Sequence, residues 1–301
     1  MNFRDLEYLI ALEELKHFRK AADKCFVSQP TLSGQIKKLE EELDVQLMER
    51  SSRKVIFTPA GLDIVAKAKT ILLEAKSLRE LAKSHNEPMR GTLHIGLIPT
   101  VAPYLLPLII PIMKETFPDL ELYLHENQTA VLLKQLEQGE LDCLMLAVLP
   151  GMENFKQVEL YDEPLELALS DKHSWSNNRL INLQELSGEH VLMLEDGHCL
   201  RDQALGFCFT AGAIEDSSFK ATSLETLRHM ISAENGLTLL PQLAIPLNRA
   251  QSGVKYIPFE APVPSRKIVL LSRNNSARQV CFDQLAELIN KTVSKRLAEY
   301  Q

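Results

Sequence analysis

The amino-acid sequence predicts an α/β protein with a helical N-terminal part and a larger part in which strands and helices alternate. Three observations support this prediction. Apolar residues recur at three-and-four spacing through residues 1–84, as they do on one face of an α-helix. A segment rich in turn-forming residues, 85–91, interrupts that pattern. Beyond it, short apolar runs alternate with helical stretches, which is typical of an α/β sheet.

Composition and charge limit the function. The chain has 301 residues, 45% of them hydrophobic, which is enough for a large core. The formal net charge is −7, and it is unevenly spread. Residues 1–90 carry 16 Lys and Arg against 14 Asp and Glu, whereas the rest carries 17 against 26. Such an N-terminal part binds nucleic acid only if its basic side chains gather on one face.

The five cysteines are odd in number and irregularly spaced, unlike those of a secreted disulfide framework. The N-terminus lacks the pattern of a signal peptide. The longest apolar run, 105–113, is too short to span a membrane and contains Pro107 and Pro111. We therefore expect a cytoplasmic protein without membrane contact, in which a disulfide is transient and regulatory.

Residues 1–57 predict short helices over 5–12, 18–25 and 31–43, a break at 27–30, and a strand at 55–57 after a polar turn. Two helices around a tight break are typical of a helix-turn-helix, whose second helix enters the DNA major groove. The residues that open this helix are small or polar, namely Ser28, Gln29, Pro30, Thr31, Ser33, Gln35 and Lys37. Arg50 and Arg53 are expected to grip phosphates as part of a wing. A small helical bundle with a solvated charged face is the alternative.

Thr58-Pro59 is a strong helix start, because a capping hydroxyl precedes a proline at the first helical position. The predicted helix continues to about Ser84. Its apolar residues form a narrow seam, made of Leu62, Val65, Ala68, Leu72, Ala75, Leu78 and Ala82. A seam of this kind pairs helices from two chains. The alternative is packing against the chain's own body.

Beyond the hinge, the sequence predicts strands at 92–98, 120–125, 141–147, 165–170, 190–194, 237–240 and 268–272. It predicts helices at 101–117, 130–138, 223–233 and 277–297.

The most informative segment of this half is 194–208, which contains Cys199 and Cys208. We predict that Asp196 caps a helix that begins near His198 and places Cys199 in its first turn. A helix start with His198 and Arg201 nearby favours the thiolate, although Glu195 and Asp202 oppose it. Cys208 lies between Phe207 and Phe209, and such apolar neighbours disfavour a thiolate.

The two cysteines are nine positions apart. In a continuous helix this spacing corresponds to roughly 13 Å along the axis, whereas a disulfide needs Cα atoms within about 7 Å. The pair can therefore close only if the segment is remodelled, as in a switch. One alternative is that these are buried small apolar residues, as we expect for Cys25, Cys143 and Cys281. A metal site of His198, Cys199 and Cys208 lacks the usual ligand spacing.

A known family matches the N-terminal part. The runs 18–22, 27–40, 47–50 and 57–61, from Phe18-Arg19-Lys20-Ala21-Ala22 to Phe57-Thr58-Pro59-Ala60-Gly61, resemble the LysR-type transcriptional regulators. The resemblance implies a winged helix-turn-helix at 1–57, a dimerising linker helix and hinge at 58–90, and a redox-sensing effector domain at 91–301. That domain is expected to be periplasmic-binding-protein-like, with two α/β lobes, one formed by about 91–163 and 269–301 and the other by about 164–268. Gly34 is a small departure from the family's pattern, because a glycine inside the recognition helix lowers the intrinsic helicity of that helix.

The runs 91–101, 194–208 and 221–228 resemble more narrowly the hydrogen-peroxide sensors of this family. This implies that Cys199 is oxidised by peroxide to a sulfenic acid and that Cys208 resolves it as a disulfide. It also implies a peroxide pocket of Thr100, Thr129, His198 and Arg266, whose donors stabilise charge on the departing oxygen. By themselves, Thr100 and Thr129 are as well explained as helix caps, and Arg266 as a surface charge.

The leading prediction is thus a peroxide-sensing regulator that controls antioxidant-defence genes and is not an enzyme. We expect it to bind double-stranded promoter DNA and RNA polymerase, to pair through the linker helix and form a homotetramer, to be reduced by a thiol-disulfide system, and to need no cofactor or metal. A regulator gated by a small ligand between the lobes is the second hypothesis. A thiol peroxidase with a DNA-binding appendage is the third.

Overall fold

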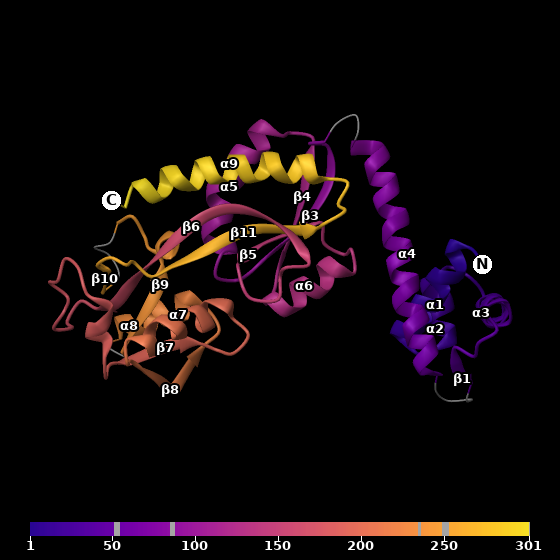
Figure 1. The fold of residues 1–301 in the computed structure, drawn as a ribbon, viewed down its shortest axis with the longest axis horizontal. Coiled ribbons are helices and arrows are strands. Elements are labelled where there is room, and N and C mark those ends of the chain that lie inside the picture. The colour runs from indigo at the N-terminus through magenta and orange to yellow at the C-terminus, as the bar shows by residue number, and fades with distance from the viewer. Residues whose placement is uncertain (51–54, 85–87, 234–235, 249–252, 301) are drawn as a thin grey trace. The chain divides into compact units, whose positions relative to one another are not determined.

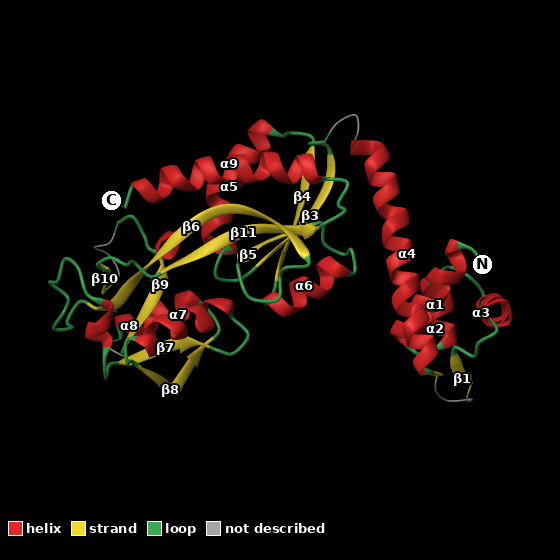
Figure 2. Cartoon of the chain, in the orientation of Figure 1, coloured by secondary structure: helices red, strands yellow, loops and turns green. Residues whose placement is uncertain are grey.

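The computed structural model describes residues 1–50, 55–84, 88–233, 236–248 and 253–300, and it forms two compact units, residues 1–85 and 86–301 (Figure 1). Figure 2 shows that the first unit is almost entirely helical, whereas the second combines a sheet with helices. No helix among the described residues is long and apolar enough to cross a membrane.

The first unit is built on helices that start where the sequence provides caps. Its elements are α1 (Phe3–Leu15), α2 (Phe18–Lys24), α3 (Gln29–Leu43), β1 (Met48–Arg50), β2 (Val55–Phe57) and α4 (Pro59–Ser84). The Ser28 hydroxyl accepts a hydrogen bond from the Thr31 backbone and caps α3, and the Thr58 hydroxyl accepts one from Gly61 at 3.0 Å and caps α4. The predicted start of the long helix is therefore confirmed, whereas α3 begins two residues earlier than predicted.

The strands β1 and β2 form a short antiparallel ribbon between α3 and α4, with Glu49 opposite Ile56. Gly61 packs so closely on the backbone just before β1 that a Cβ atom there would lie 2.0 Å from the Leu47 carbonyl oxygen. This close approach explains why position 61, three residues after the capping Thr58, is a glycine. Arg53 and the side chain of Arg50 lie outside the described residues.

The apolar seam of α4 serves two different surfaces. Val65 and Ala68 are 4% and 1% exposed and pack in the unit's own core with Leu9 and Leu12 of α1. For these two residues, packing against the chain's own body is correct and pairing with another chain is wrong. In contrast, Leu62 and Leu78 are exposed on α4.

The second unit is one mixed sheet with helices packed on it. Its elements are β3 (Gly91–Leu97), α5 (Ala102–Thr116), β4 (Leu120–Glu126), α6 (Thr129–Glu137), β5 (Cys143–Ala147), β6 (Phe155–Ser170), η1 (Leu183–Leu186), β7 (His190–Leu194), α7 (Cys199–Thr210), β8 (Ile214–Ala221), α8 (Leu224–Ser232), β9 (Leu237–Pro241), η2 (Gln242–Ala244), β10 (Val254–Pro258), β11 (Ser265–Arg273) and α9 (Gln279–Ala298). The strand order is β4-β3-β5-β11-β6-β9-β7-β8, with β10 also paired to β6.

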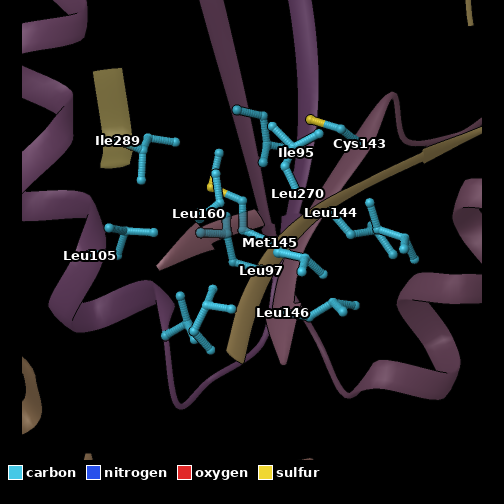
Figure 3. Packing of buried hydrophobic residues seen from close by; sticks show 14 of the residues in the cluster. Ile95, Leu97, Leu105, Cys143, Leu144, Met145, Leu146, Leu160, Leu270 and Ile289 are labelled. Carbon is cyan, nitrogen blue, oxygen red and sulfur yellow. The ribbon is translucent and has the colours of Figure 1, made fainter. Parts of the chain in front are cut away.

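The long strand β6 joins two separate hydrophobic cores. Its first half pairs with β11 and its second half with β9 and β10 (Figure 1). Core I lies between β3, β5 and β11 and the helices α5, α6 and α9, where Ile95, Met145 and Leu270 pack together (Figure 3). Core II contains the second half of β6 with β7, β9, β10, α7 and α8. We call the parts around these cores lobe I and lobe II.

The predicted strands and helices of this unit are all present. The structure also contains β8, β10 and the first half of β6, which the sequence pattern did not predict. The first half of β6 includes half-buried and exposed polar residues, such as Lys156 and Glu159, so it lacks a continuous apolar run. Arg266, which we expected just before the last strand, lies inside β11.

Candidate functional site

Cys199 is the first residue of α7, in the turn that follows β7. Gly197 adopts a φ of +94°, a conformation that favours glycine, and brings the chain into the helix. Cys199 in the first turn confirms one prediction. The predicted cap is wrong, because His198 is the N-cap and makes no side-chain capping bond, while Asp196 pairs with Arg201 and Lys220.

The Cys199 thiol is buried, with 3% of the residue exposed, and belongs to core I. Burial raises its pKa above the ordinary value, because an apolar environment destabilises the thiolate. The charge of Arg266 opposes this effect, as do the hydroxyl of Thr129 and the backbone amides of Ala147 and Leu200. The prediction that the helix start favours a thiolate is therefore wrong for the net effect, since burial outweighs the polar neighbours.

Arg201 does not face the thiol as predicted. Its guanidinium binds both carboxylate oxygens of Glu215, at 2.9 and 3.2 Å, and approaches Asp196 at 3.0 Å and Asp202 at 3.6 Å. Three carboxylates thus neutralise this charge on the outer side of α7. The cation that acts on Cys199 is Arg266, from a strand 67 positions later in the sequence.

Arg266 is 2% exposed, so it is not a surface charge. Its NH1 and NH2 groups donate to the hydroxyl and carbonyl oxygens of Thr100, both at 2.9 Å. Its Nε donates to Glu163 Oε2 at 2.8 Å. Glu163 is the residue that sequence reasoning missed. The only signal was that a buried arginine needs a buried carboxylate, and the sequence does not say which one.

The two threonines do not cap helices. Thr100 accepts the bond from Arg266, and Thr129 is the first residue of α6, after the uncapped Gln128. The Thr129 hydroxyl is buried and forms no hydrogen bond of ordinary geometry, yet it lies near enough to Cys199 to lower the pKa of the thiol. A buried hydroxyl without a partner is available to a ligand.

His198, the fourth predicted pocket residue, is 6% exposed, and its Nε2 lies 3.9 Å from Glu195 Oε1. Thr100 and Arg266 are thus in direct contact. Arg266 and Thr129 both lower the pKa of the Cys199 thiol. His198 precedes Cys199 in the chain. The arrangement places hydrogen-bond donors and one positive charge around a buried sulfur. Such a site can bind a small polar molecule and stabilise an anion that leaves during reaction at sulfur.

Cys208 lies in a different environment, as predicted. It is 1% exposed in core II, and burial raises the pKa of its thiol to about 12. Both thiols are free, and α7 is continuous from one to the other. The helix spacing separates the two Cα atoms by roughly 13 Å. A bond between them therefore requires that α7 be remodelled.

The remaining cysteines differ in burial. Cys143 and Cys281 are fully buried as predicted, but Cys25 is partly exposed, so burial is wrong for that residue. Among the described residues, no group of three or more His, Cys, Asp and Glu side chains could hold a metal ion.

The DNA-reading residues predicted for the helix-turn-helix extend from Ser28, the N-cap of α3, to Lys37 in the middle of that helix. Ser28, Gln29, Pro30, Thr31 and Lys37 are exposed, and Ser33 and Gln35 are half-buried. Leu32 and Ile36 face the core of the unit, which leaves the polar side chains on the outer face. Phe26, just before α3, is 96% exposed with a φ of +56°. The helix thus presents a polar surface that can enter a groove.

Known proteins match both units. Residues 3–62 match the model of the bacterial regulatory helix-turn-helix protein, lysR family, and residues 86–294 match the LysR substrate binding domain. The chain is 57% identical over 291 residues, 97% of its length and 96% of the relative's, to a protein of Pectobacterium carotovorum named hydrogen peroxide-inducible genes activator.

Solved structures agree. A full-length OxyR variant from Pseudomonas aeruginosa matches with a TM-score of 0.76 and 35% identity, over 96% of this chain and 94% of the other. The oxidised form of OxyR matches with a TM-score of 0.64 and 54% identity, over 69% of this chain and 98% of the other. With family models over both units and relatives of this similarity, the chain belongs to the LysR family of bacterial helix-turn-helix regulators.

Proposed function

We propose that this protein is a cytoplasmic transcription regulator that responds to hydrogen peroxide, and that a reversible disulfide between Cys199 and Cys208 switches it. The observation that carries the proposal is that the two thiols lie in different cores and a bond between them is incompatible with the continuous helix α7. The names of the relatives, which refer to peroxide and to oxidised OxyR, support the choice of signal.

The chemistry has two balanced steps. The Cys199 thiolate attacks one peroxide oxygen, the O–O bond breaks, and the departing hydroxide takes a proton to become water, leaving a sulfenic acid. Cys208 then condenses with the sulfenic acid, forming the disulfide and a second water. A thiol-disulfide reductant restores both thiols by exchange.

Each pocket residue has a role in the first step. Arg266 stabilises the thiolate and the negative charge on the departing oxygen. Thr129 has a free hydroxyl to orient the peroxide, and Thr100 fixes the guanidinium. We place His198, the buried neighbour of Cys199 in the chain, at the edge of this pocket. Because Cys199 remains mostly protonated at neutral pH, we place its activation in the complex with peroxide.

The readout is DNA binding. We propose that α3 enters the major groove with Gln29 and Thr31 near the base edges, while Arg50 and Arg53 contact phosphates. We further propose that exposed apolar residues of α4 such as Leu78 pair two chains, that pairs assemble into a homotetramer, and that the bound protein contacts RNA polymerase at antioxidant-defence genes. The division into residues 1–57, 58–90 and 91–301 remains part of this proposal.

One experiment tests the core of the proposal. The reduced protein is treated with one equivalent of hydrogen peroxide, its disulfides are mapped by mass spectrometry, and DNase footprints of the reduced and oxidised forms are compared. We expect a Cys199–Cys208 disulfide and a changed footprint. A disulfide between other cysteines, or identical footprints despite complete oxidation, would refute the proposal.

A further inference from the structure

The partner of the cation near Cys199 is a buried carboxylate. Glu163 on β6 and Arg266 on β11 are opposite each other in the antiparallel register, and they are 1% and 2% exposed. Glu163 Oε2 accepts a hydrogen bond from Nε of Arg266 at 2.8 Å and lies 2.7 Å from its NH2 group in an ion pair. Its other oxygen accepts from the backbone nitrogen of Leu243 at 3.1 Å. The Glu163 carboxylate thus connects β11, through Arg266, to η2, through Leu243.

The same guanidinium also binds Thr100 and acts on the thiol of Cys199. Two of its N–H groups hold Thr100 in the β3–α5 loop, and its charge reaches Cys199. The guanidinium charge therefore acts on two groups that can carry negative charge, Glu163, which it binds, and the Cys199 thiolate. The buried ion pair with Glu163 therefore already largely neutralises the charge of Arg266.

We propose that Glu163 is a positioning residue that restrains the charge of Arg266 and thereby sets the reactivity of Cys199. This inference rests on the proposed role of Cys199 as the reactive thiol. A buried cation without a counter-ion is strongly unfavourable. When its usual counter-ion is removed, the cation therefore stabilises any other anion nearby more strongly. Without the Glu163 charge, the Cys199 thiolate becomes the anion that balances Arg266. Glu163 therefore keeps the thiol less reactive than its cationic neighbour alone would make it.

The geometry requires a carboxylate at this position. Donors approach Glu163 from two sides, the guanidinium on one and the Leu243 backbone on the other, so both oxygens must accept. A glutamine would have to turn its NH2 group toward one of these donors. The Glu163→Gln variant thus removes the charge and retains only one side of the contact.

Other titratable groups near the pair do not account for the expected effect. Tyr161 on β6 and Tyr104 on α5 are phenols whose pKa values burial raises, so they are neutral at neutral pH. Beyond Tyr104 lie Glu225, which accepts its hydroxyl, and Arg228, which neutralises that carboxylate. His198 and Glu195 lie on the same segment as Cys199 and are present in every variant below. Their effect on the reactivity of Cys199 therefore cancels when the variants are compared.

The test measures thiol reactivity without peroxide. The reduced full-length protein is alkylated with iodoacetamide from pH 6 to pH 10, and the Cys199 peptide is quantified by mass spectrometry. The proteins compared are the unmodified chain, Glu163→Gln, Arg266→Gln and the double variant. For Glu163→Gln we expect the pH of half-maximal rate to fall by about one unit and alkylation at pH 7 to become about three- to tenfold faster. Arg266→Gln and the double variant should both shift to higher pH.

The opposite directions make the outcome decisive. If Glu163 merely supports the fold, Glu163→Gln will leave the pH profile unmoved or shift it upward with Arg266→Gln, and the inference is overturned. If Glu163→Gln does not fold, Glu163→Asp replaces it, because its carboxylate is drawn back from the guanidinium by about 1.5 Å. A smaller downward shift then supports the inference, and no shift overturns it.

The alkylation profile also separates this inference from the proposed function. Iodoacetamide reports the thiolate whether or not peroxide is the natural oxidant. If the profiles shift as expected but peroxide forms no Cys199–Cys208 disulfide, the proposed function fails and the role of Glu163 stands.

Discussion

Cys199 and Cys208 are the first and tenth residues of α7, and each is packed in a different hydrophobic core. Neither thiol can approach the other while the helix remains intact. The disulfide and the packing described here therefore exclude each other, and oxidation must exchange one set of contacts for another.

The first prediction is that the two cysteines are not interchangeable. Cys199 has Arg266 and Thr129 beside it, whereas burial alone determines the pKa of Cys208. After a peroxide pulse, Cys208→Ser should accumulate a sulfenic acid at Cys199 that dimedone traps, and Cys199→Ser should show no oxidation on that timescale. Mass spectrometry measures both. First oxidation at Cys208 would contradict the assignment.

The second prediction concerns the unpaired hydroxyl near the thiol. Thr129→Val keeps the shape of the side chain but removes the group that lowers the Cys199 pKa. We expect alkylation of Cys199 at pH 7 to slow about two- to tenfold, because losing this polar neighbour should raise the pKa of the thiol by up to about one unit. Because burial raises this pKa, the unmodified rate should still increase with pH above pH 8. Thr210→Val, at the exposed far end of α7, is the matched control and should leave the alkylation rate of Cys199 unchanged at every pH.

The third prediction is that oxidation opens α7. Closing the disulfide must break backbone hydrogen bonds of the helix, so the amides of residues 203–208 should exchange with solvent about tenfold faster or more in the oxidised form. Hydrogen exchange with mass spectrometry, on oxidised and reduced protein, measures this. Equal protection in both forms would mean that the disulfide leaves the helix intact, which the spacing forbids.

The fourth prediction separates the two surfaces of α4. Leu78 is 70% exposed, so Leu78→Asp should leave the first unit folded but weaken pairing between chains, seen by light scattering as a lower mass at low micromolar concentration. Val65→Asp, which buries a charge in the unit's own core, should instead lower the melting temperature of that unit. A fully associated Leu78→Asp protein would place the interface elsewhere.

The fifth prediction concerns DNA. Arg53→Ala should weaken binding to all sequences alike and reduce the slope of log Kd against log salt concentration by about one, as expected for one lost phosphate contact. Gln29→Ala, at the exposed start of α3, should change the preference among sites and leave that slope nearly unaltered. Fluorescence anisotropy over a salt series tests both. An Arg53→Ala protein with altered preference and an unchanged slope would contradict the wing assignment.

Local signals in the sequence predicted much of this structure. A capping threonine followed by proline marks the start of α4, and the strand-turn-cysteine pattern places Cys199 in the first turn of α7. Long-range pairing was not predictable in the same way. Arg201 is close to Cys199 in sequence but faces three carboxylates, while Arg266, which pairs with Glu163 through the register of β11 and β6, is the cation that acts on the thiol. Glu163 depends on the same register across 103 positions, so no local pattern indicates it.

Strand β6 has a consequence for how the two lobes communicate. It is a single strand of 16 residues that contributes to both halves of the sheet, and β11 runs beside its first half with a register shift between Ile268 and Val269. A flexible tether would let each lobe relax independently, but a twisted two-stranded ribbon resists torsion. Remodelling of α7 in lobe II should therefore twist this ribbon and rotate lobe I. In the chain, lobe I follows the hinge from the DNA-binding unit.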